Sequence, residues 1–432
     1  MLIQLLFVLV CIIIGARIGG VGLGVMGGLG VALLTFVFGL QPTSPPIDVM
    51  LMIAAVISAA AAMQAAGGLD FLVGVAEKIL RRHPQNVTLL APLVTYSFTF
   101  LAGTGHVAYS VLPVIAEVAR ETKIRPERPL GIAVIASQQA ITASPISAAT
   151  VALLGLLAGF DITLFDILKI TIPATLIGVL VGAFASMKVG KELVDDPEYQ
   201  RRLANGELDD HHIEISEIKN IFGAKLSVIL FITATILIVL FGSIPSIRPT
   251  FNGQSLGMPS IIEILMLATA AVILLVTKTS GAKAAQGSVF SAGMQAVIAI
   301  FGVAWMGDTF INGNIGQLTS SIEGIVTEMP WLFGVALFVM SILLYSQAAT
   351  VRAIMPLGIA LGLNPMLLIA LFPAVNGYFF IPNYPTVVAA INFDRTGTTK
   401  IGKYILNHSF MMPGLVATIV GIIVGLLLIQ VF

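Results

Sequence analysis

Long apolar segments alternate with short polar ones along the whole chain, and most of them approach or exceed the length of a membrane-spanning helix. A helix needs roughly 20 residues to cross about 30 Å of hydrocarbon. The segments are residues 2–16, 20–40, 47–68, 128–160, 163–187, 225–243, 259–277, 289–310, 366–392 and 404–431. The pattern predicts an all-α polytopic membrane protein with about ten transmembrane helices.

Two further segments, 87–120 and 331–362, have a different pattern. Each consists of two apolar arms of about 15 residues, too short for two full crossings, around a small polar break. The breaks are Gly103-Thr104-Gly105-His106 and Ser346-Gln347-Ala348-Ala349-Thr350. Interrupted backbone at membrane depth is tolerated only where it is buried in protein or lines a watery cavity. We therefore expect two re-entrant hairpins whose tips lie beside such a cavity.

The distribution of basic residues predicts how the hairpins enter the membrane, because Lys and Arg in short loops mark the cytoplasmic side. They occur on both flanks of the first hairpin, at Lys78, Arg81, Arg82, Arg120, Lys123, Arg125 and Arg128. Residues 311–330 and 361–366, which flank the second hairpin, contain neither Lys nor Arg. The first hairpin is expected to enter from the cytoplasm and the second from outside, with both termini on the outer, periplasmic side.

Residues 188–224 form the one sizeable polar segment and divide the chain into two halves, 1–187 and 225–432. Each half contains three predicted spans, a hairpin and two more spans. Because the number of spans per half is odd, the two halves are expected to have opposite orientations, joined by a cytoplasmic linker. Inverted repeats are a frequent plan of secondary transporters, which bind substrate near the midplane where broken helices meet.

Two of the predicted spans, 128–160 and 366–392, are longer than one crossing needs and contain prolines. A proline inside a helix removes a hydrogen bond and clashes with the preceding turn. We expect the spans to unwind at Thr142-Ala-Ser144-Pro145-Ile-Ser147 and at Pro382-Asn383-Tyr384-Pro385-Thr386. With the hairpin tips they would place four half-helix ends around one cavity, where positive N-terminal ends and free N–H groups suit an anion. The alternative is a set of simple proline kinks packed by Ser and Thr.

The expected substrate-binding site comprises residues of these four breaks and one nearby charge. They are Gly103, Thr104, Gly105, His106, Thr142, Ser144, Pro145, Ser147, Ser346, Gln347, Ala348, Ala349, Thr350, Arg352, Pro382, Asn383, Tyr384, Pro385 and Thr386. Hydroxyl and amide groups can bind a carboxylate stripped of water, although small-residue helix packing is the alternative. Arg352 would be a costly charge inside the membrane and suits a carboxylate, unless it snorkels to the surface. His106 either titrates or contacts substrate, or it is a hydrogen-bonded structural residue. Asp70 and Asp308 could cap the helices that follow them or coordinate a cation.

The composition argues against several classes of protein and of binding site. Hydrophobic residues make up 57% of the 432 residues and charged residues 10%, whereas about a quarter of the residues of soluble proteins are charged. A net charge of zero without a long basic block argues against nucleic-acid binding. The single cysteine, Cys11, excludes an intramolecular disulfide and a Cys-based zinc site; neither a metal nor a cofactor is expected. H-E-x-x-H and G-x-x-x-x-G-K-[ST] motifs do not occur, so we expect a secondary transporter and not an enzyme.

Many short motifs along the chain resemble one known family. They are Gly15-Ala-Arg17-Ile-Gly-Gly, Ala65-Ala-Gly-Gly-Leu-Asp70, Leu80-Arg-Arg, Ala102-Gly-Thr-Gly-His106, Leu112-Pro-Val-Ile-Ala-Glu117, Arg125-Pro-Glu-Arg-Pro129, Ile141-Thr-Ala-Ser-Pro-Ile-Ser147, Ser346-Gln-Ala-Ala349, Pro382-Asn-Tyr-Pro385 and Gly397-Thr-Thr-Lys-Ile-Gly402. By these the sequence resembles the anaerobic C4-dicarboxylate transporter (Dcu) family of bacterial inner membranes over essentially its whole length. The resemblance implies uptake, exchange and efflux of fumarate, succinate, malate and aspartate, chiefly fumarate–succinate antiport in anaerobic respiration.

The hairpin pattern is also similar to a wider ion-transporter superfamily that includes sodium-coupled dicarboxylate carriers. In that superfamily a Ser-Asn-Thr sequence at each tip binds carboxylate and helps to hold sodium, whereas both tips differ here, which puts a sodium site in doubt. The superfamily also implies a homodimer embedded in membrane lipid. A cation-coupled carrier of another organic anion, such as citrate or an amino acid, and a membrane sensor with a degenerate carrier fold remain as alternatives.

Overall fold

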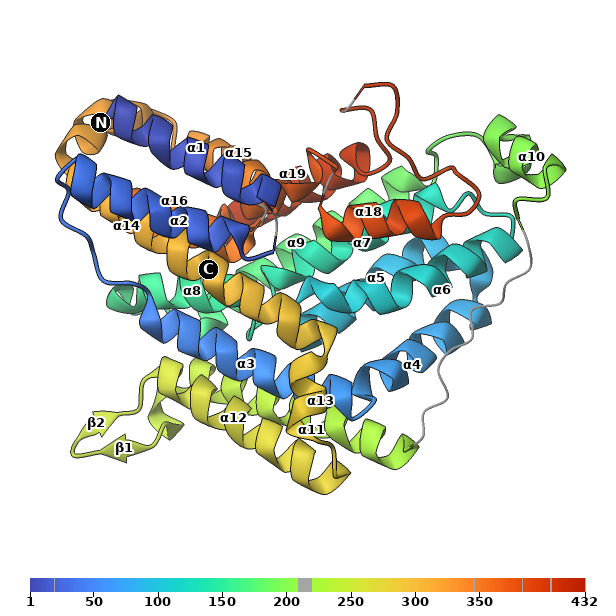
Figure 1. The fold of residues 1–432 in the computed structure, drawn as a ribbon, viewed down its shortest axis with the longest axis horizontal. Helices are drawn as coiled ribbons and strands as arrows, with labels where there is room; N and C mark the ends of the chain where they lie inside the picture. The colour runs from blue at the N-terminus through green and yellow to red at the C-terminus, as the bar shows by residue number, and fades with distance from the viewer. Residues whose placement is uncertain (19, 209–219, 345, 383, 405, 432) are drawn as a thin grey trace.

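The computed structural model describes residues 1–432 except 19, 209–219, 345, 383, 405 and 432. Almost every ordered element among the described residues is a helix; a short antiparallel pair, β1 (Thr250–Phe251) with β2 (Gln254–Ser255), is an exception. Figure 1 shows β1–β2 and helix α10 (Pro197–Ala204) at opposite ends of the long axis of the molecule. The predicted all-α class is confirmed at this level.

The helices follow the predicted order of apolar segments. Those before the linker are α1 (Leu2–Ile18), α2 (Gly22–Ala32), α3 (Ile47–Ala65), α4 (Gly68–Arg82), α5 (Val87–Ala102), α6 (Ala108–Glu121), α7 (Glu127–Ile141), α8 (Ala148–Leu157) and α9 (Leu164–Ser186). Those after it are α11 (Ile221–Ser243), α12 (Met258–Thr277), α13 (Gly281–Gln286), α14 (Ser288–Glu328), α15 (Leu332–Leu344), α16 (Gln347–Ala360), α17 (Pro365–Ala370), α18 (Pro385–Phe393) and α19 (Met411–Leu428). A π-helical segment, η1 (Leu33–Val37), and the 3₁₀ segments η2 (Pro84–Asn86), η3 (Gly105–Val107), η4 (Ala158–Phe160), η5 (Leu193–Asp195), η6 (Pro245–Ile247) and η7 (Phe372–Phe379) complete the set.

Several helices have the length and apolar character of membrane spans. Among the described residues they are α9, α11, α12, α14 over Ser288–Asn314, and α19, and α3 with α4 forms a further candidate pair that is bent by 70° at its break. Large apolar side chains such as Phe36, Phe222 and Leu275 are exposed on the outside, as expected for a surface that faces lipid. The chain is therefore a multi-pass membrane protein, while the predicted number of ten spans stays a prediction.

Several element boundaries differ from the sequence-based expectations. The last helix, α19, begins at Met411 and not at residue 404, because the described residues before it form loop hydrogen bonds, including a bridge between Ile401 and His408. Helix α14 runs beyond residue 310, as far as Glu328. The segment 366–392 is more irregular than expected, since α17, η7 and α18 divide it.

The two predicted helix caps by aspartates are not present. Asp308 lies in the interior of α14, so the prediction that it caps a helix is wrong. Asp70 lies in the first turn of α4, where the N-cap residue is Gly67 and no side chain caps the helix. Gly67 has a positive φ of 85°, which lets the chain turn sharply between α3 and α4. The span predicted as 47–68 consequently ends at Ala65.

Glycines allow α2 and α14 to pack in close contact. A methyl group at Gly24 would overlap the carbonyl group of Ile298, and one at Gly302 would overlap the carbonyl oxygen of Gly24. Small residues allow helix backbones to approach closely inside membranes, where van der Waals packing drives association. The glycine-rich sequence of α2 therefore fixes the first helices against α14.

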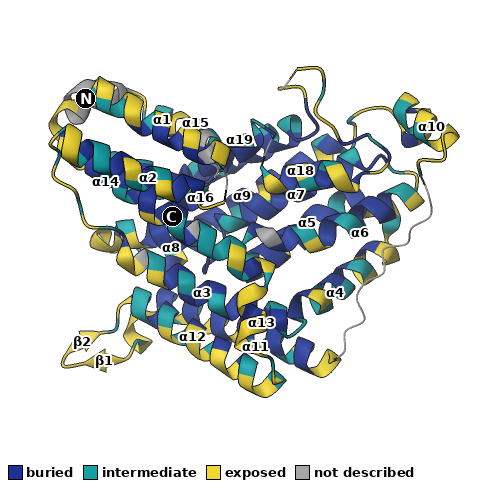
Figure 2. Ribbon diagram, viewed as in Figure 1, coloured by how far each residue is buried: buried dark blue, intermediate teal, exposed yellow. Residues whose placement is uncertain are grey.

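Helix α7 lies near the centre of the packed helices. It contacts α5, α6, α9 and α19, and nearly all of its residues are buried. Figure 2 shows this contrast, with buried residues along α7 and exposed residues along the outer helix α12. Because α7 ends directly before the break at Thr142, its central position brings that break into the middle of the protein.

Candidate functional site

The tip of the first hairpin lies against the break between α7 and α8. Helix α5 ends at Ala102 and is followed by the C-cap residue Gly103, whose φ of 69° is typical of a glycine that terminates a helix. A Cβ atom at Gly103 would lie 2.9 Å from the side chain of Ile146. The hydroxyl of Ser144 donates a hydrogen bond of 2.7 Å to the carbonyl oxygen of Phe100. Two of the four predicted breaks are therefore in direct contact.

The tip of the second hairpin meets α7 from the other half of the chain. Ser346 caps α16, since its Oγ accepts a hydrogen bond of 3.2 Å from the N–H of Ala349. The next side chain, Gln347, donates from Nε2 to Oε1 of Gln138 at 2.8 Å. A methyl group at Gly105 in the first tip would overlap the amide of the same Gln138. Gln138 therefore lies between the two hairpin tips.

Four amide side chains and a hydroxyl form one buried network, which we call the amide cluster: Gln138, Gln139, Gln347, Asn376 and Thr418. Gln347 Nε2 also approaches Oδ1 of Asn376 at 3.2 Å, and Asn376 Nδ2 donates to Oε1 of Gln139 at 3.2 Å. Gln139 donates in turn to the hydroxyl of Thr418 at 3.0 Å. All five side chains are buried, where a paired polar network favours one arrangement and an unpaired group is costly.

Most members of the amide cluster were not among the residues predicted from the sequence. Gln347 was, whereas Gln138, Gln139, Asn376 and Thr418 were not. A signal was present, because amide side chains in the apolar stretches of α7 and η7 are costly to bury without partners. Their partners lie more than 200 residues away along the chain in several cases, and no local pattern indicates which residues those are.

The hydroxyl groups of the break after α7 mostly bind the end of that helix. Thr142 donates to the carbonyl oxygen of Gln139 at 2.8 Å. Ser147 donates to the carbonyl oxygen of Ile141 at 2.5 Å. The hydroxyl of Ser147 also caps α8, because it accepts a hydrogen bond from the N–H of Thr150. These bonds satisfy backbone groups that a helix end leaves without partners. Pro145 lies between these groups, in the same break.

The fourth predicted break lies between η7 and α18. The ring of Tyr384 packs on the ring of Tyr378 with centroids 4.8 Å apart, and the hydroxyl of Tyr378 donates to the carbonyl oxygen of Val134 in α7 at 3.4 Å. Pro385 is the first residue of α18, and the buried hydroxyl of Thr386 has no hydrogen-bond partner among the described residues. Pro382 precedes them, and Asn383 lies outside the described residues.

The first tip also borders a small cavity. Gly103 and Thr104 line a volume of about 70 Å³ with residues of α3, α8 and α14, which is below the 300–1,000 Å³ typical of pockets for drug-sized ligands. The backbone of His106 belongs to η3, and its side chain is outside the described part of the structure. Ala348, Ala349 and Thr350 are buried in the first turn of α16. The tips and the amide cluster are thus closely packed in this conformation.

Arg352 lies apart from the hydrogen bonds of the amide cluster. Its Nη2 is 3.8 Å from Oδ2 of Asp308 in α14, and its buried Nε has no partner among the described residues. It also lines a hollow of about 790 Å³, which we call the outer cavity. Other residues that line it are Pro45, Asp48, Asp161, Arg248 and Gly257. The structure therefore brings together both tips and the first break, and places Arg352 at a separate cavity.

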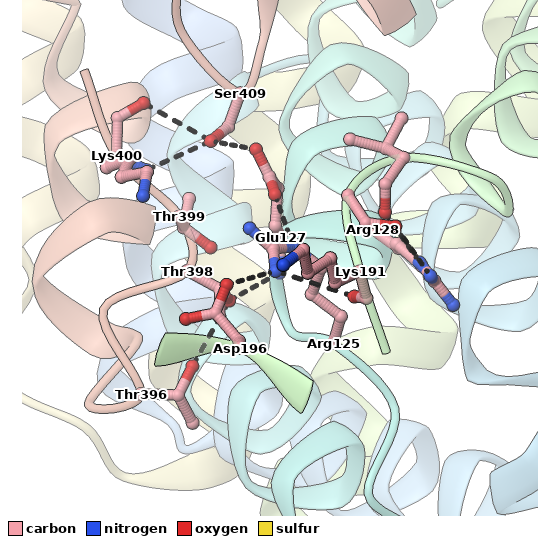
Figure 3. A network of polar contacts seen from close by, with 12 residues as sticks. Arg125, Glu127, Arg128, Lys191, Asp196, Thr396, Thr398, Thr399, Lys400 and Ser409 are labelled. Atoms are coloured by element: carbon pink, nitrogen blue, oxygen red, sulfur yellow. Dashed lines mark hydrogen bonds and ion pairs between the residues drawn. The ribbon is translucent and has the colours of Figure 1, made fainter. Parts of the chain in front are cut away.

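A second polar network, which we call the loop network, joins the residues before and at the start of α7, the linker, and the segment between α18 and α19 (Figure 3). It contains Arg125, Glu127, Asp196, Thr398 and Ser409. Arg125 forms ion pairs of 2.5 Å with Glu127 and 2.6 Å with Asp196, while Ser409 donates to Glu127 at 2.7 Å. Burial raises the pKa of Asp196, but hydrogen bonds from Arg125 and from backbone N–H groups lower it below its ordinary value.

One hydrolase-like motif occurs far from these clusters. Residues Gly253 to Gly257 match G-x-S-x-G, which in α/β-hydrolases places a serine on a strained strand-to-helix turn. Here Ser255 belongs to β2 and pairs with Thr250 of β1 on the surface. In the described part of the chain no hydrogen bond joins Ser255 to a histidine or a carboxylate, so the motif lacks the partners of a nucleophile.

Comparison with known proteins gives a consistent result over the whole length. The family described as "Anaerobic c4-dicarboxylate membrane transporter" matches residues 1–432. The chain is 41% identical over 434 residues to anaerobic C4-dicarboxylate transporter DcuB of Escherichia coli O6:H1, covering 98% of this chain and 97% of the relative. It is 44% identical over 423 residues to C4-dicarboxylate transporter DcuA of Wolinella succinogenes, with 98% and 97% covered. With DcuA of Escherichia coli K12 the identity is 43% over 437 residues, and 99% of each chain is covered.

A solved structure supports the fold. MtrF of Neisseria gonorrhoeae, from a class of antimetabolite efflux pumps, aligns with a TM-score of 0.50 and 12% identity, covering 92% of this chain and 84% of that one. At this identity the similarity concerns the fold alone. The full-length family match and the identity to several relatives decide the assignment: the chain belongs to the anaerobic C4-dicarboxylate membrane transporter family.

Proposed function

We propose that this protein is a secondary transporter that moves C4-dicarboxylates such as fumarate, succinate, malate and aspartate by uptake, exchange and efflux. The observation that carries the proposal is the family match over residues 1–432, with relatives at 41% to 44% identity that are named C4-dicarboxylate transporters. Fumarate–succinate exchange in anaerobic metabolism is the expected main mode. Transport involves no covalent step, so the protein acts as a carrier and not as an enzyme.

The proposed substrate site is formed by the four helix breaks around the amide cluster. Gln347 and Gln138 supply amide N–H donors, and the first turns of α16 and α8 supply backbone N–H groups at positive helix ends. A dicarboxylate at neutral pH is a dianion, whose burial requires such compensation. The contacts between both tips and Gln138 support this location, since one substrate there would touch elements of both halves.

The proposed architecture consists of inverted repeats, 1–187 and 225–432, joined by the cytoplasmic linker 188–224. The positions of the loop network and of the outer cavity support this architecture. The loop network joins Arg125, on the flank of the first hairpin that is predicted to be cytoplasmic, to Asp196 in the linker. The outer cavity is lined largely by segments next to loops that are external if the termini are external. Transport would then occur by movement of the unit that bears the hairpins against the remaining helices, in the bacterial inner membrane, with periplasmic termini and a homodimeric assembly.

Exchange in proteoliposomes tests the proposal directly. The purified protein is reconstituted with unlabelled succinate inside, and the entry of labelled succinate, fumarate, malate, aspartate, citrate and glutamate is measured in parallel. Accelerated entry of the four-carbon dicarboxylates, and competition among them, is the expected outcome. Preference for citrate or glutamate, or entry that internal substrate does not accelerate, would contradict the proposal.

A further inference from the structure

Arg352 and Asp308 are two charged residues in the interiors of packed helices. Asp308 lies midway along α14 and Arg352 lies in α16, and their side chains are 18% and 14% exposed. Charged groups at such positions in membrane proteins are costly and usually face a partner or a watery cavity. Here both conditions hold, because the residues face each other and Arg352 lines the outer cavity.

The contact between the two residues uses only part of the guanidinium. The distance from Nη2 to Oδ2 is 3.8 Å, whereas a charge-assisted hydrogen bond of this kind has a length of about 2.7 to 2.9 Å. Nε of Arg352 is buried without a partner among the described residues, although a guanidinium has five N–H donors. The pair therefore leaves a buried donor of the guanidinium unused.

The other charged residues that line the outer cavity differ from Arg352 in their hydrogen-bond partners. Arg248 donates from Nε to the carbonyl oxygen of Phe241 at 2.7 Å and from Nη2 to that of Gly242 at 3.4 Å, at the end of α11. Asp48 and Asp161 also line the cavity, and within the described residues no ion pair joins either of them to Arg352. Among the described arginines, Arg352 therefore combines a place at this cavity with a buried donor that lacks a partner.

We propose that Asp308 is an internal counter-ion that holds Arg352 in the empty carrier and is displaced when substrate enters through the outer cavity, on its way to the amide cluster, and one of its carboxylates binds the guanidinium. This inference rests on the proposed dicarboxylate transport. The volume of about 790 Å³ beside Arg352 leaves room for a small dianion. Because Asp308 and substrate compete for one cation, Asp308 weakens substrate binding and speeds substrate release, which favours rapid exchange.

Two substitutions at Asp308 test the competition because they act in opposite directions. Asp308→Asn removes the competing charge at nearly constant size, so the KM for external succinate should fall about tenfold, within the range of typical coupling between two ligands, and the maximal exchange rate should also fall. Asp308→Glu keeps the charge and extends its reach toward Arg352, so the KM should rise several-fold. A merely structural residue would give loss of transport in both variants without a lower KM.

Asp161→Asn is the matched control, because it removes the same charge from the same cavity without touching the pair. Asp161 has a φ of 56°, which asparagine tolerates well. A fall in KM equal to that of Asp308→Asn would assign the effect to the general field of the cavity and overturn the inference. An unchanged or raised KM in Asp308→Asn would also overturn the inference. If Asp308→Asn does not fold, an unchanged KM in Asp308→Glu would overturn it. Failure of the unmodified protein to exchange any C4-dicarboxylate would instead contradict the proposed function.

Discussion

Gln138 is the residue at which the two halves of the chain meet. Its amide accepts from Gln347 at the second tip and lies against the backbone of Gly105 at the first. A movement of either hairpin must therefore change the surroundings of this one side chain. Because the side chain is buried, any hydrogen bond that it loses must be replaced by substrate, by water or by another protein group.

Gly105→Ala tests this contact. The added methyl group would overlap the Gln138 amide, so the amide would have to shift, which disturbs its bond to Gln347. Overpacking of this kind costs about 1 to 3 kcal/mol, so we expect a lower unfolding temperature in detergent and a strongly reduced rate of succinate exchange. Gly74→Ala is the control, since a methyl group there meets no atom within 4 Å; equal effects of the two variants would argue against a special role of Gly105.

Arg352→Ala should weaken succinate binding by about 2 to 5 kcal/mol, because removal of one partner of a buried charge pair leaves the other uncompensated. Arg352→Lys should restore only part of the affinity, since an ammonium group cannot reproduce the planar fork of guanidinium. Succinate binding to protein in detergent, measured by calorimetry, gives the affinities. Near-normal affinity of Arg352→Ala would show that this residue does not bind the substrate.

At the scale of helices, the sequence predicts the breaks better than the boundaries. Gly103, Ser147 and Ser346 are local signals, a glycine that ends a helix and serines that begin one, and helices end or begin there. The start of α19 is determined by distant groups, such as the bond from Ser409 to Glu127. Such a contact between residues far apart in sequence leaves no local pattern, so the segment 404–410 reads as part of an apolar span.

The orientation of the two hairpins can be tested with single cysteines in a Cys11→Ala background. His83 precedes the first hairpin and Ala360 ends the second one, and both residues are exposed. Because basic residues flank the first hairpin alone, His83→Cys should react with a membrane-impermeant maleimide from the cytoplasmic side and Ala360→Cys from the periplasmic side. Labelling of both cysteines from one side would contradict the inverted repeats.

At the scale of the whole molecule, the loop network ties the linker to both halves of the chain. The pKa of Asp196 is lowered in the folded protein, so its contribution to stability is present above the unfolded value of about 3.9 and is lost as the pH falls through the lower folded value. Asp196→Asn should therefore reduce the free energy of unfolding at pH 7 by about 2 kcal/mol, with a smaller difference below pH 4. The neighbouring exposed residue provides the control, Asp195→Asn, and thermal unfolding from pH 3 to 8 provides the measurement.

The charge of the substrate determines whether transport needs an ion gradient or a membrane potential as a driving force. When one dianion enters for each dianion that leaves, the charges carried in the two directions cancel, so exchange requires neither a membrane potential nor a coupled ion. The helix ends, the amide cluster and Arg352 provide compensation that belongs to the protein and returns with it. Net uptake lacks this cancellation and is expected to require protons.

Succinate–succinate exchange in sodium-free choline buffer at constant pH examines this expectation. We expect the same exchange rate with and without sodium, and with and without a potential imposed by valinomycin and a potassium gradient. Sodium can bind to backbone carbonyls and hydroxyls of broken helices without any acidic side chain, so the sodium comparison separates two real alternatives. A strict sodium requirement, or a strong response of the exchange rate to the potential, would mean that a cation moves with the substrate during the loaded step.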